Sequence, residues 1–349
     1  MNLALLKELC EARGVPGQEA DIRAIVRREL SELSPSEMRV DAMGNLYATF
    51  PGSRPEKIMI AAHMDEIGFM IKHVDDKGFL RLQPLGGFDP RQLFAQRVLV
   101  TARDGRVLPG VLCYATKPPH LLSKPDATPP EIEQFFVDTG MRAAEARETF
   151  EIGGMVTMDR SLAVCGEAIV SKSLDNRVGV FVMIEALRKM KSNDFTVVAV
   201  ATTQEEIGLR GATTAAYQIQ PYVGIALDTT IAADAPGGDP EGRVTALGEG
   251  VGIKLMDGSM VSHPLLVTHM RELAARDSIA HQLEVLPRGG TDGGALQRAA
   301  NGCAGITLSI PTRYIHTVNE MVYRKDVEAA VSLLATYLGE AQNGDYDWH

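Results

Sequence analysis

Cysteine is scarce in this chain of 349 residues: only Cys10, Cys113, Cys165 and Cys303 are present, and they lie far apart. No two of them form a C-x-x-C pair, which excludes a cysteine-rich zinc site and a thioredoxin-type redox motif. We expect the thiols to be reduced, as in a cytoplasmic protein. Long apolar runs are missing as well, since the longest, Val178 to Ile184, is far too short to span a bilayer.

Basic clusters are also absent. The 35 Lys and Arg residues are outnumbered by 45 Asp and Glu residues, which gives a formal net charge of −10. Neither nucleic acid nor an anionic membrane surface is therefore expected as a partner. Aromatic residues make up only 5% of the chain, with a single Trp, while 45% of the residues are hydrophobic. This composition is that of an ordinary globular protein, and the length suggests about two domains.

Strand-like and helix-like patterns alternate over most of the chain. Helical spacing of apolar residues appears at 3–10, 19–33, 176–191 and 327–338, and apolar runs of strand type at 57–62, 196–202, 223–228 and 305–310. A hairpin is predicted over 38–50, and a helix is expected to begin near Glu206. The alternation predicts an α/β fold with a mixed, largely parallel sheet flanked by helices.

Between Gly68 and Val164 the pattern changes to short β-like runs separated by Gly and Pro, with a Pro-rich loop over 117–130. This change predicts a small β-rich domain inserted into a larger one. We expect the first part of the larger domain at 1–67, the insert at 68–164 and the second part at 165–349.

Polar side chains follow three of the predicted strands where they end. The motif HMDEIG begins at His63, QEEIG begins at Gln204, and Asp228 ends the third run. Ligands of open α/β sheets bind outside the carboxyl ends of the strands, so we expect one convergent site. Asp175, before a helix, and His316, after the strand at 305–310, extend the set. The candidate metal ligands are His63, Asp175, Glu206, Asp228 and His316, a donor mix typical of a pair of Zn²⁺, Co²⁺ or Mn²⁺ ions.

Each of these residues has a simpler explanation when it is taken alone. His63 could be a hydrogen-bonding residue at a strand end, and Asp175 could be a helix N-cap. Glu205 and Glu206 could complement the dipole in the first turn of a helix. Asp228 is harder to explain in this way, because a carboxylate beside an apolar core needs a partner.

The motifs resemble those of the tetrahedral (TET) aminopeptidases, the family of glutamyl, leucyl, lysyl and deblocking aminopeptidases. Four motifs carry the resemblance: HMDEIG at 63–68, SLDNRVG at 173–179, QEEIGLRGA at 204–212 and IPTRYIH at 310–316. Two further motifs support it, ALDTTIAADAPGG at 226–238 and GGTDGG at 289–294. It covers the whole chain in the right order. It implies a metallo-aminopeptidase acting on short peptides, a PDZ-like β-barrel dimerisation domain as the insert, and a dodecamer built from dimers.

The resemblance also implies a role for each ligand. His63 and Asp228 would hold one metal ion, Glu206 and His316 the other, and Asp175 would bridge the two. The ions would be Zn²⁺ or Co²⁺, between which the ligand chemistry does not choose.

Further residues receive roles around these ligands. The resemblance makes Glu205 the general base and gives Asp65 a hydrogen bond from His63, as metal-bound histidines usually require. Gly290 and Thr291 are candidates for substrate contacts, although turn geometry explains the loop glycines equally well. Lys254 is a candidate by resemblance alone, and a solvated surface lysine is the simpler interpretation.

Two alternatives from other classes remain. A glycoside hydrolase uses two carboxylates as acid and base, but it needs no paired histidines, and one Trp offers little sugar stacking. A non-catalytic scaffold could grip peptides with the insert, although the complete ligand set and the retained base argue against it. The preferred N-terminal residue of the substrate is not fixed by the sequence.

Overall fold

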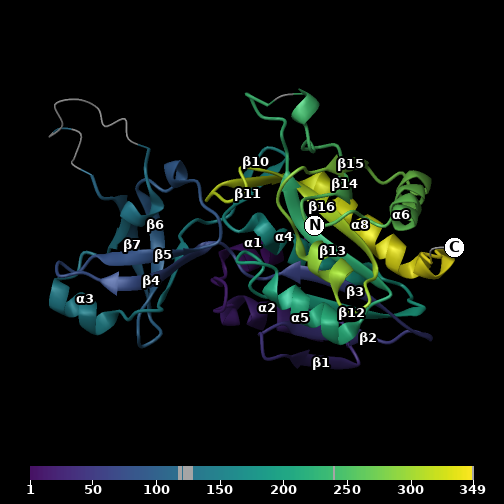
Figure 1. Ribbon diagram of the computed structural model, residues 1–349, viewed down its shortest axis with the longest axis horizontal. Helices are drawn as coiled ribbons and strands as arrows, with labels where there is room; N and C mark the ends of the chain where they lie inside the picture. Colours follow the sequence, from purple (N-terminus) through teal and green to yellow (C-terminus); the bar gives the residue numbers. More distant parts are fainter. Residues whose placement is uncertain (117–119, 121–128, 239, 348–349) are drawn as a thin grey trace.

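The computed structural model describes residues 1–116, 120, 129–238 and 240–347, which form two lobes (Figure 1). The larger lobe is built on an 11-stranded mixed sheet, and the smaller lobe is a closed barrel. Most of the Pro-rich segment predicted as a loop over 117–130 lies outside the described residues. No helix among the described residues is both long and apolar enough to cross a membrane.

The centre of the large sheet is parallel. Its neighbouring strands are β12 (Phe195–Thr202), β3 (Arg54–His63), β13 (Val223–Ile231) and β16 (Ala304–Arg313), in that order. Their near-continuous runs of Val, Ile and Ala suit strands that are buried on both faces. The predicted α/β fold with a mixed, largely parallel sheet is thereby confirmed.

Antiparallel strands extend this centre on both sides. On the β12 side lie β2 (Leu46–Phe50) and β1 (Glu37–Val40), which form the predicted hairpin. On the other side lie β17 (Glu320–Tyr323), β11 (Ala168–Ser171) and β10 (Ala163–Cys165). In addition, β14 (Val251–Met256) pairs with both β16 and β15 (His281–Val285).

Helices cover both faces of the large sheet. One face, which includes Ile58 and Ile60, packs in the main core with the helices α1 (Leu3–Glu11), α2 (Ala20–Ser31), α4 (Leu174–Lys189), α6 (Pro264–Arg276) and α8 (Arg324–Glu340). The opposite face, which includes Met59 and Ala61, packs against α5 (Arg210–Ile219) and α7 (Asp292–Arg298). The alternation along β3 follows from the two-residue period of a strand.

The smaller lobe is the barrel, whose strands close in the order β4-β5-β8-β7-β6-β9. The strands are β4 (Gly68–Val74), β5 (Leu80–Leu85), β6 (Gln96–Thr101), β7 (Val107–Tyr114), β8 (Phe135–Asp138) and β9 (Met155–Met158), and α3 (Ala143–Thr149) lies beside them. The barrel has its own core around Phe69, Phe135 and Phe150. Its strands fall inside the predicted insert, whereas the last insert residues, from Ala163, already pair with β11 in the large sheet.

Candidate metal centre

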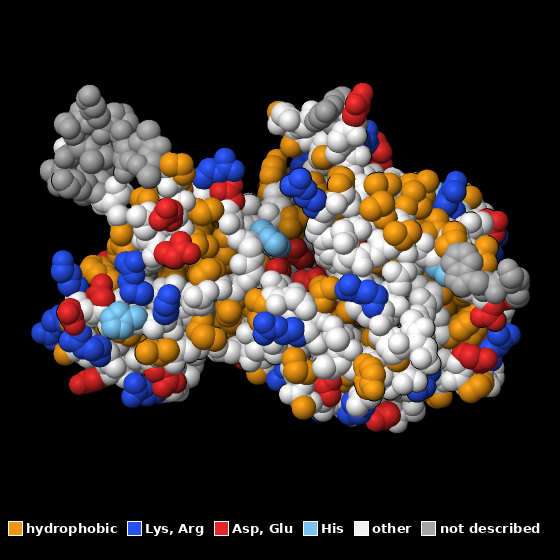
Figure 2. Space-filling model, in the orientation of Figure 1, with side chains coloured by type: hydrophobic (Ala, Val, Ile, Leu, Met, Phe, Trp, Pro, Cys, Tyr) orange, Lys and Arg blue, Asp and Glu red, His pale blue; other side chains and the backbone are white. Residues whose placement is uncertain are grey.

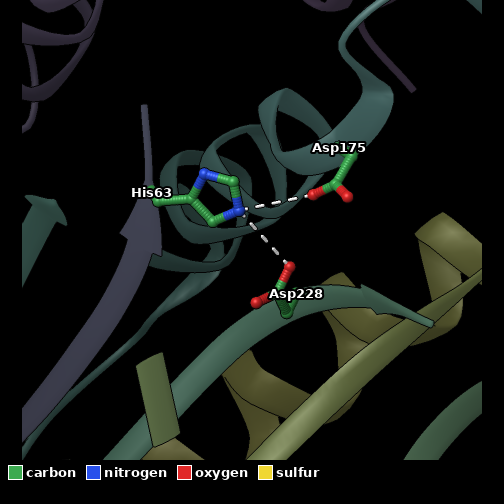
Figure 3. A group of neighbouring side chains, drawn as sticks. All are labelled: His63, Asp175 and Asp228. Atoms are coloured by element: carbon green, nitrogen blue, oxygen red, sulfur yellow. Dashed lines mark ion pairs between the residues drawn. The ribbon is translucent and has the colours of Figure 1, made fainter. Parts of the chain in front are cut away.

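The strand ends meet at one edge of the large sheet. His63 is the last residue of β3, and Asp228 lies in the carboxyl-terminal half of the neighbouring parallel strand β13. Figure 3 shows the carboxylates of Asp228 and of Asp175, which comes from the start of α4, both pointing toward the His63 ring. The His63 Nε2 atom lies 3.3 Å from Asp175 Oδ1 and 3.6 Å from Asp228 Oδ1. All three side chains are buried.

A second group forms on the other side of Asp175. His316 Nε2 lies 3.5 Å from Asp175 Oδ2 and 3.4 Å from Glu206 Oε2. The two oxygens of the Asp175 carboxylate therefore face different histidines. This is the arrangement that a carboxylate bridging two metal ions requires.

The spacing of the donor atoms fits divalent ions. Zn²⁺ is bound by nitrogen and oxygen at about 2.0–2.2 Å, so two ligands at a tetrahedral angle lie roughly 3.3–3.6 Å apart. The four histidine–carboxylate distances above, 3.3 to 3.6 Å, fall in this range. In each group, the donor atoms lie within 4.8 Å of one another. The buried Asp175 Oδ1 atom also has no hydrogen-bond partner among the residues that the structure describes. The residues present thus fit the metal pair.

The electrostatics of the site favour cations. Burial raises the pKa of Glu206 well above its usual range, and the nearby Asp175 charge raises it further. Burial likewise raises the pKa of Asp228. For His63, burial lowers the pKa, but the surrounding carboxylates of Glu205, Asp175 and Asp228 raise it more, and the result is well above the usual value. A bound divalent ion would reverse these shifts by stabilising the carboxylates as anions and the imidazoles as neutral ligands.

Glu205 and Glu206 lie in a turn and not in a helix. The helix expected to begin near Glu206 begins at Arg210, so that prediction is wrong, and so is the first-turn explanation of the two glutamates. Gln204 (φ +56°) and Leu209 (φ +57°) both adopt left-handed backbone conformations, and the chain turns between them. The spacing of the apolar residues does not reveal this turn. The turn brings the Glu205 carboxylate to 3.9 Å from His63 Nε2.

Asp65 accepts a hydrogen bond from His63, as predicted, and its carboxylate has a second task. Its backbone carbonyl lies 3.0 Å from His63 Nδ1 and accepts the ring hydrogen bond, while its carboxylate lies farther away, at 3.7 Å. The carboxylate accepts hydrogen bonds from the backbone N–H groups of Glu205, at 3.0 Å, and Glu206, at 3.1 Å. Asp65 therefore fixes the ring through its main chain and the Glu205–Glu206 turn through its side chain. Asp175, for its part, is not the N-cap: the neighbouring Asn176 accepts a hydrogen bond from the Gly179 N–H at 3.1 Å and so caps the helical turns that follow.

A cavity of about 300 Å³ opens beside these residues. Figure 2 shows acidic side chains and a histidine in the hollow between the lobes. Gly290 and Thr291 line the cavity, as expected of substrate contacts. Lys254 does not. It is fully buried, with Nζ 2.8 Å from Glu284 and 3.4 Å from Asp257, so the interpretation as a surface lysine is wrong.

Comparison with known proteins identifies the family. A model of the family described as M42 glutamyl aminopeptidase matches residues 44–333. The chain belongs to the peptidase M42 family. A lysyl aminopeptidase of Pyrococcus furiosus is 36% identical over 351 residues, covering 98% of each chain. Among solved structures, the aminopeptidase APDkam598 of the archaeon Desulfurococcus kamchatkensis matches with a TM-score of 0.92 and 38% identity, over 97% of this chain and 94% of that one.

The fold of the TET peptidases is shared as well. The TET1 peptidase of Pyrococcus horikoshii matches this M42 chain with a TM-score of 0.86 and 30% identity, over 97% of this chain and 99% of that one. A structure named endoglucanase from Thermotoga maritima is a weaker match, with a TM-score of 0.79 and 28% identity. The resemblance stated from the motifs is confirmed, and the comparisons together support aminopeptidase activity.

One residue of this M42 site escaped the sequence analysis. Glu320, in β17, is buried, and its Oε2 accepts a hydrogen bond from the Asp175 N–H at 2.9 Å. Its Oε1 accepts one from the His316 N–H at 2.8 Å. A single carboxylate thus holds the backbone of two candidate ligands that are 141 positions apart in the chain. Only its place four residues after His316 hinted at this role.

Glu320→Gln should weaken metal binding. The glutamine amide offers one acceptor oxygen, so one of the two backbone N–H groups loses its partner, and changes of this kind typically cost about 10- to 100-fold in metal affinity. Calorimetric titration of the metal-free protein with Zn²⁺ measures the effect. Glu272→Gln, on the exposed face of α6, is the matched control. Unchanged affinity in Glu320→Gln would show that the backbone of Asp175 and His316 is held by other contacts.

Proposed function

We propose that this M42 aminopeptidase uses two divalent metal ions, Zn²⁺ or Co²⁺, to remove N-terminal residues from short peptides. The observation that carries the proposal is the Asp175 carboxylate, whose two oxygens each face a different histidine. His63 and Asp228 would hold one ion, Glu206 and His316 the other, and Asp175 would bridge them. Such ions, when bound, lower the pKa of water and polarise a peptide carbonyl.

In this proposal Glu205 is the general base. Its carboxylate lines the cavity and points toward His63, and Asp65 holds its backbone. It would take a proton from the attacking water and deliver it to the leaving amine. One carboxylate can serve both steps because it stays beside the reacting atoms.

The space around the site suits a short peptide. His316 lines both the cavity of about 300 Å³ and a second one of about 710 Å³, which lies between the loop after β16 and barrel residues such as Phe88 and Gln92. We assign the smaller cavity to the N-terminal residue and the larger one to the rest of the peptide. Gly290 and Thr291 would contact the N-terminal residue.

We further propose that the chain forms a dodecamer built from dimers, with the barrel domain at 68–164 as the dimerisation unit. The TET1 peptidase of Pyrococcus horikoshii is described as assembling into a tetrahedron or a large octahedral shell. On the barrel, the apolar side chains of Phe94, Val107 and Val111 are 46%, 38% and 42% exposed, as expected of a surface that another subunit covers. A cytoplasmic location is consistent with four free cysteines.

The two alternative functions have less support. A glycoside hydrolase needs two carboxylates placed on either side of a sugar, whereas those in this site face histidines. A non-catalytic scaffold would not need Glu205 beside the ligand set.

Chelation should abolish the activity. A chelator removes ions that five ligands share, and added Co²⁺ or Zn²⁺ should restore the hydrolysis of an aminoacyl anilide. A soluble cellulose tested in parallel should not be cleaved with or without metal. Full anilide hydrolysis by a rigorously metal-free preparation would contradict the metal mechanism, and metal-independent cleavage of cellulose would favour the glycoside hydrolase.

The adjacent glutamates should respond differently to the same substitution. Glu205→Gln should keep both metals and lose about 10²- to 10⁴-fold in kcat, because it removes the base and keeps the shape. Glu206→Gln should lose part of the metal content, with activity partly restored by excess metal. Elemental analysis and kcat, measured on both variants, separate the roles. If Glu205→Gln loses a metal and Glu206→Gln keeps both, the two assignments are reversed.

Light scattering should find a large homo-oligomer. Val111→Glu places a charge on the exposed apolar face of the barrel and should shift the protein toward smaller species, because burying an unpaired charge is costly. A wild-type protein that is fully active as a monomer at micromolar concentration would refute the assembly.

A further inference from the structure

The segment between α1 and α2 carries a motif that the proposed function does not use. The motif reads GVPGQE and covers residues 14–19, and its last residue, Glu19, stands at the N-cap position of α2. Glutamate is not among the residues preferred there, and within the described part of the chain the Glu19 side chain makes no capping hydrogen bond. The residue is nevertheless buried, with 3% of its surface exposed. Its burial therefore needs another explanation.

The Glu19 carboxylate joins two segments that lie far apart in the chain. Its Oε1 atom accepts a hydrogen bond from the Gly17 N–H at 2.7 Å and another from the Gln204 N–H at 3.3 Å. Gln204 opens the turn over 204–209 and directly precedes Glu205, the proposed general base. Its left-handed backbone (φ +56°) is unfavourable for a residue other than glycine. The bond to Glu19 therefore holds this turn at its first residue.

Three successive backbone N–H groups of the turn donate to buried carboxylates. Gln204 donates to Glu19, and Glu205 and Glu206 donate to the two oxygens of Asp65, at 3.0 and 3.1 Å. A buried N–H group without an acceptor is costly, so each of the three needs one. Because each Asp65 oxygen already accepts one bond, Glu19 supplies the acceptor for the third.

The segment that carries Glu19 is itself anchored to both lobes. The Gly14 carbonyl accepts a hydrogen bond from the Glu66 N–H at 2.8 Å, directly after Asp65 in the chain. The Gln18 side chain donates to the carbonyl of Gly153, in the barrel domain, at 2.9 Å. Glu19 therefore reaches the turn from a backbone that is fixed on both sides.

A purely structural role explains less of this geometry. Burial, and then the nearby Asp65 charge, raise the pKa of Glu19 to about 7, so an apolar side chain would be less costly in this place. The bond to Gly17 would be enough to close the segment over 14–19. The bond to Gln204 adds nothing to that segment, but it fixes the residue next to Glu205.

We propose that Glu19 is a positioning residue for the general base. By accepting the hydrogen bond of the Gln204 N–H, it keeps the turn in the conformation that holds the Glu205 carboxylate 3.9 Å from His63 Nε2. A misplacement of about 1 Å can cost on the order of 10²-fold in rate, so an anchor of the backbone affects the reaction without touching the substrate. The inference rests on the proposed function, which makes Glu205 the base.

Two substitutions of Glu19 separate its acceptor oxygen from its charge. Alanine leaves the Gln204 N–H without this acceptor, whereas glutamine keeps an oxygen and removes only the charge. With Co²⁺-loaded protein and leucine p-nitroanilide, Glu19→Ala should lower kcat about 10- to 100-fold and leave KM within about twofold of wild type. Glu19→Gln should keep kcat within about threefold of wild type. Equal losses of kcat in the two variants would overturn the inference.

Metal content separates an effect on the base from an effect on the ligands. Glu19→Ala should retain both metals, because Asp65 still holds the backbone of Glu206. Elemental analysis measures this. A loss of metal in proportion to the loss of kcat would overturn the inference, since Glu19 would then act through the metal ligands.

Glu29→Ala is the matched control. It removes another buried carboxylate of α2, one that pairs with Arg28 and Arg188 and does not contact the turn. This variant should lower the melting temperature and keep the wild-type kcat; a loss of kcat as large as that of Glu19→Ala would overturn the inference. If Glu19→Ala does not fold, Glu19→Asp replaces it, since its shorter side chain draws the acceptor away from Gln204, and the same loss of kcat is expected.

A double-mutant cycle with Glu205→Gln tests whether Glu19 acts through the base. In the Glu205→Gln background, Glu19→Ala should change kcat by less than about twofold, because no base remains to be positioned. An equal loss in both backgrounds would overturn the inference. Full activity of Glu205→Gln alone would overturn the assignment of the base in the proposed function, whereas wild-type kcat in Glu19→Ala beside an impaired Glu205→Gln would overturn only the inference about Glu19.

Discussion

Buried negative charge at the carboxyl edge of the sheet is the constraint on which the rest of this structure depends. Asp175, Glu206 and Asp228 converge there with two imidazoles, and Asp65, Asp292 and Glu320 lie buried around them. Burial raises the pKa of Asp292 to about 7 and that of Glu320 to about 8. Carboxylates removed from water in this way are costly unless cations or hydrogen bonds compensate them. Divalent ions are the compensation that the donor geometry fits, so a bound metal would also stabilise this edge.

Hydrogen bonds from backbone N–H groups to two buried carboxylates hold the main chain of the site in place. Asp65 fixes the turn with Glu205 and Glu206, and Glu320 fixes the backbone of Asp175 and His316. Several residues at the site adopt left-handed backbone conformations, among them Ser173 (φ +56°), Gln204 (φ +56°) and His316 (φ +63°). Such conformations are unfavourable for residues other than glycine and persist where the surroundings enforce them. In this protein, the hydrogen bonds of the buried Asp65 and Glu320 carboxylates help to hold the backbone in these conformations.

Residues of the barrel domain form one wall of a pocket at the site. Phe88, Gln92 and Leu93, from the segment between β5 and β6, line a small pocket with Glu206 and His316. The same pocket includes Lys172 and Glu66, which form a buried ion pair at 2.7 Å beside Ser173. The two lobes thus share one wall at the metal centre.

The local patterns of the sequence determined much of this architecture. The period of the apolar residues predicted the central strands and the principal helices. The polar residues after the strand ends predicted four of the five candidate ligands, since parallel strands bring their carboxyl ends to one edge, and the fifth, Asp175, was expected before a helix. Contacts between distant segments were decided only by the tertiary structure. Glu320 reaches Asp175 because β17 pairs with β11, and Lys254 meets Glu284 because β14 pairs with β15. Neither pairing can be predicted from local periodicity, and neither can the left-handed turn that delays the start of α5 to Arg210. Periodicity reports which face of an element is buried, whereas the partner of a polar group depends on strand order and register, which the whole fold sets.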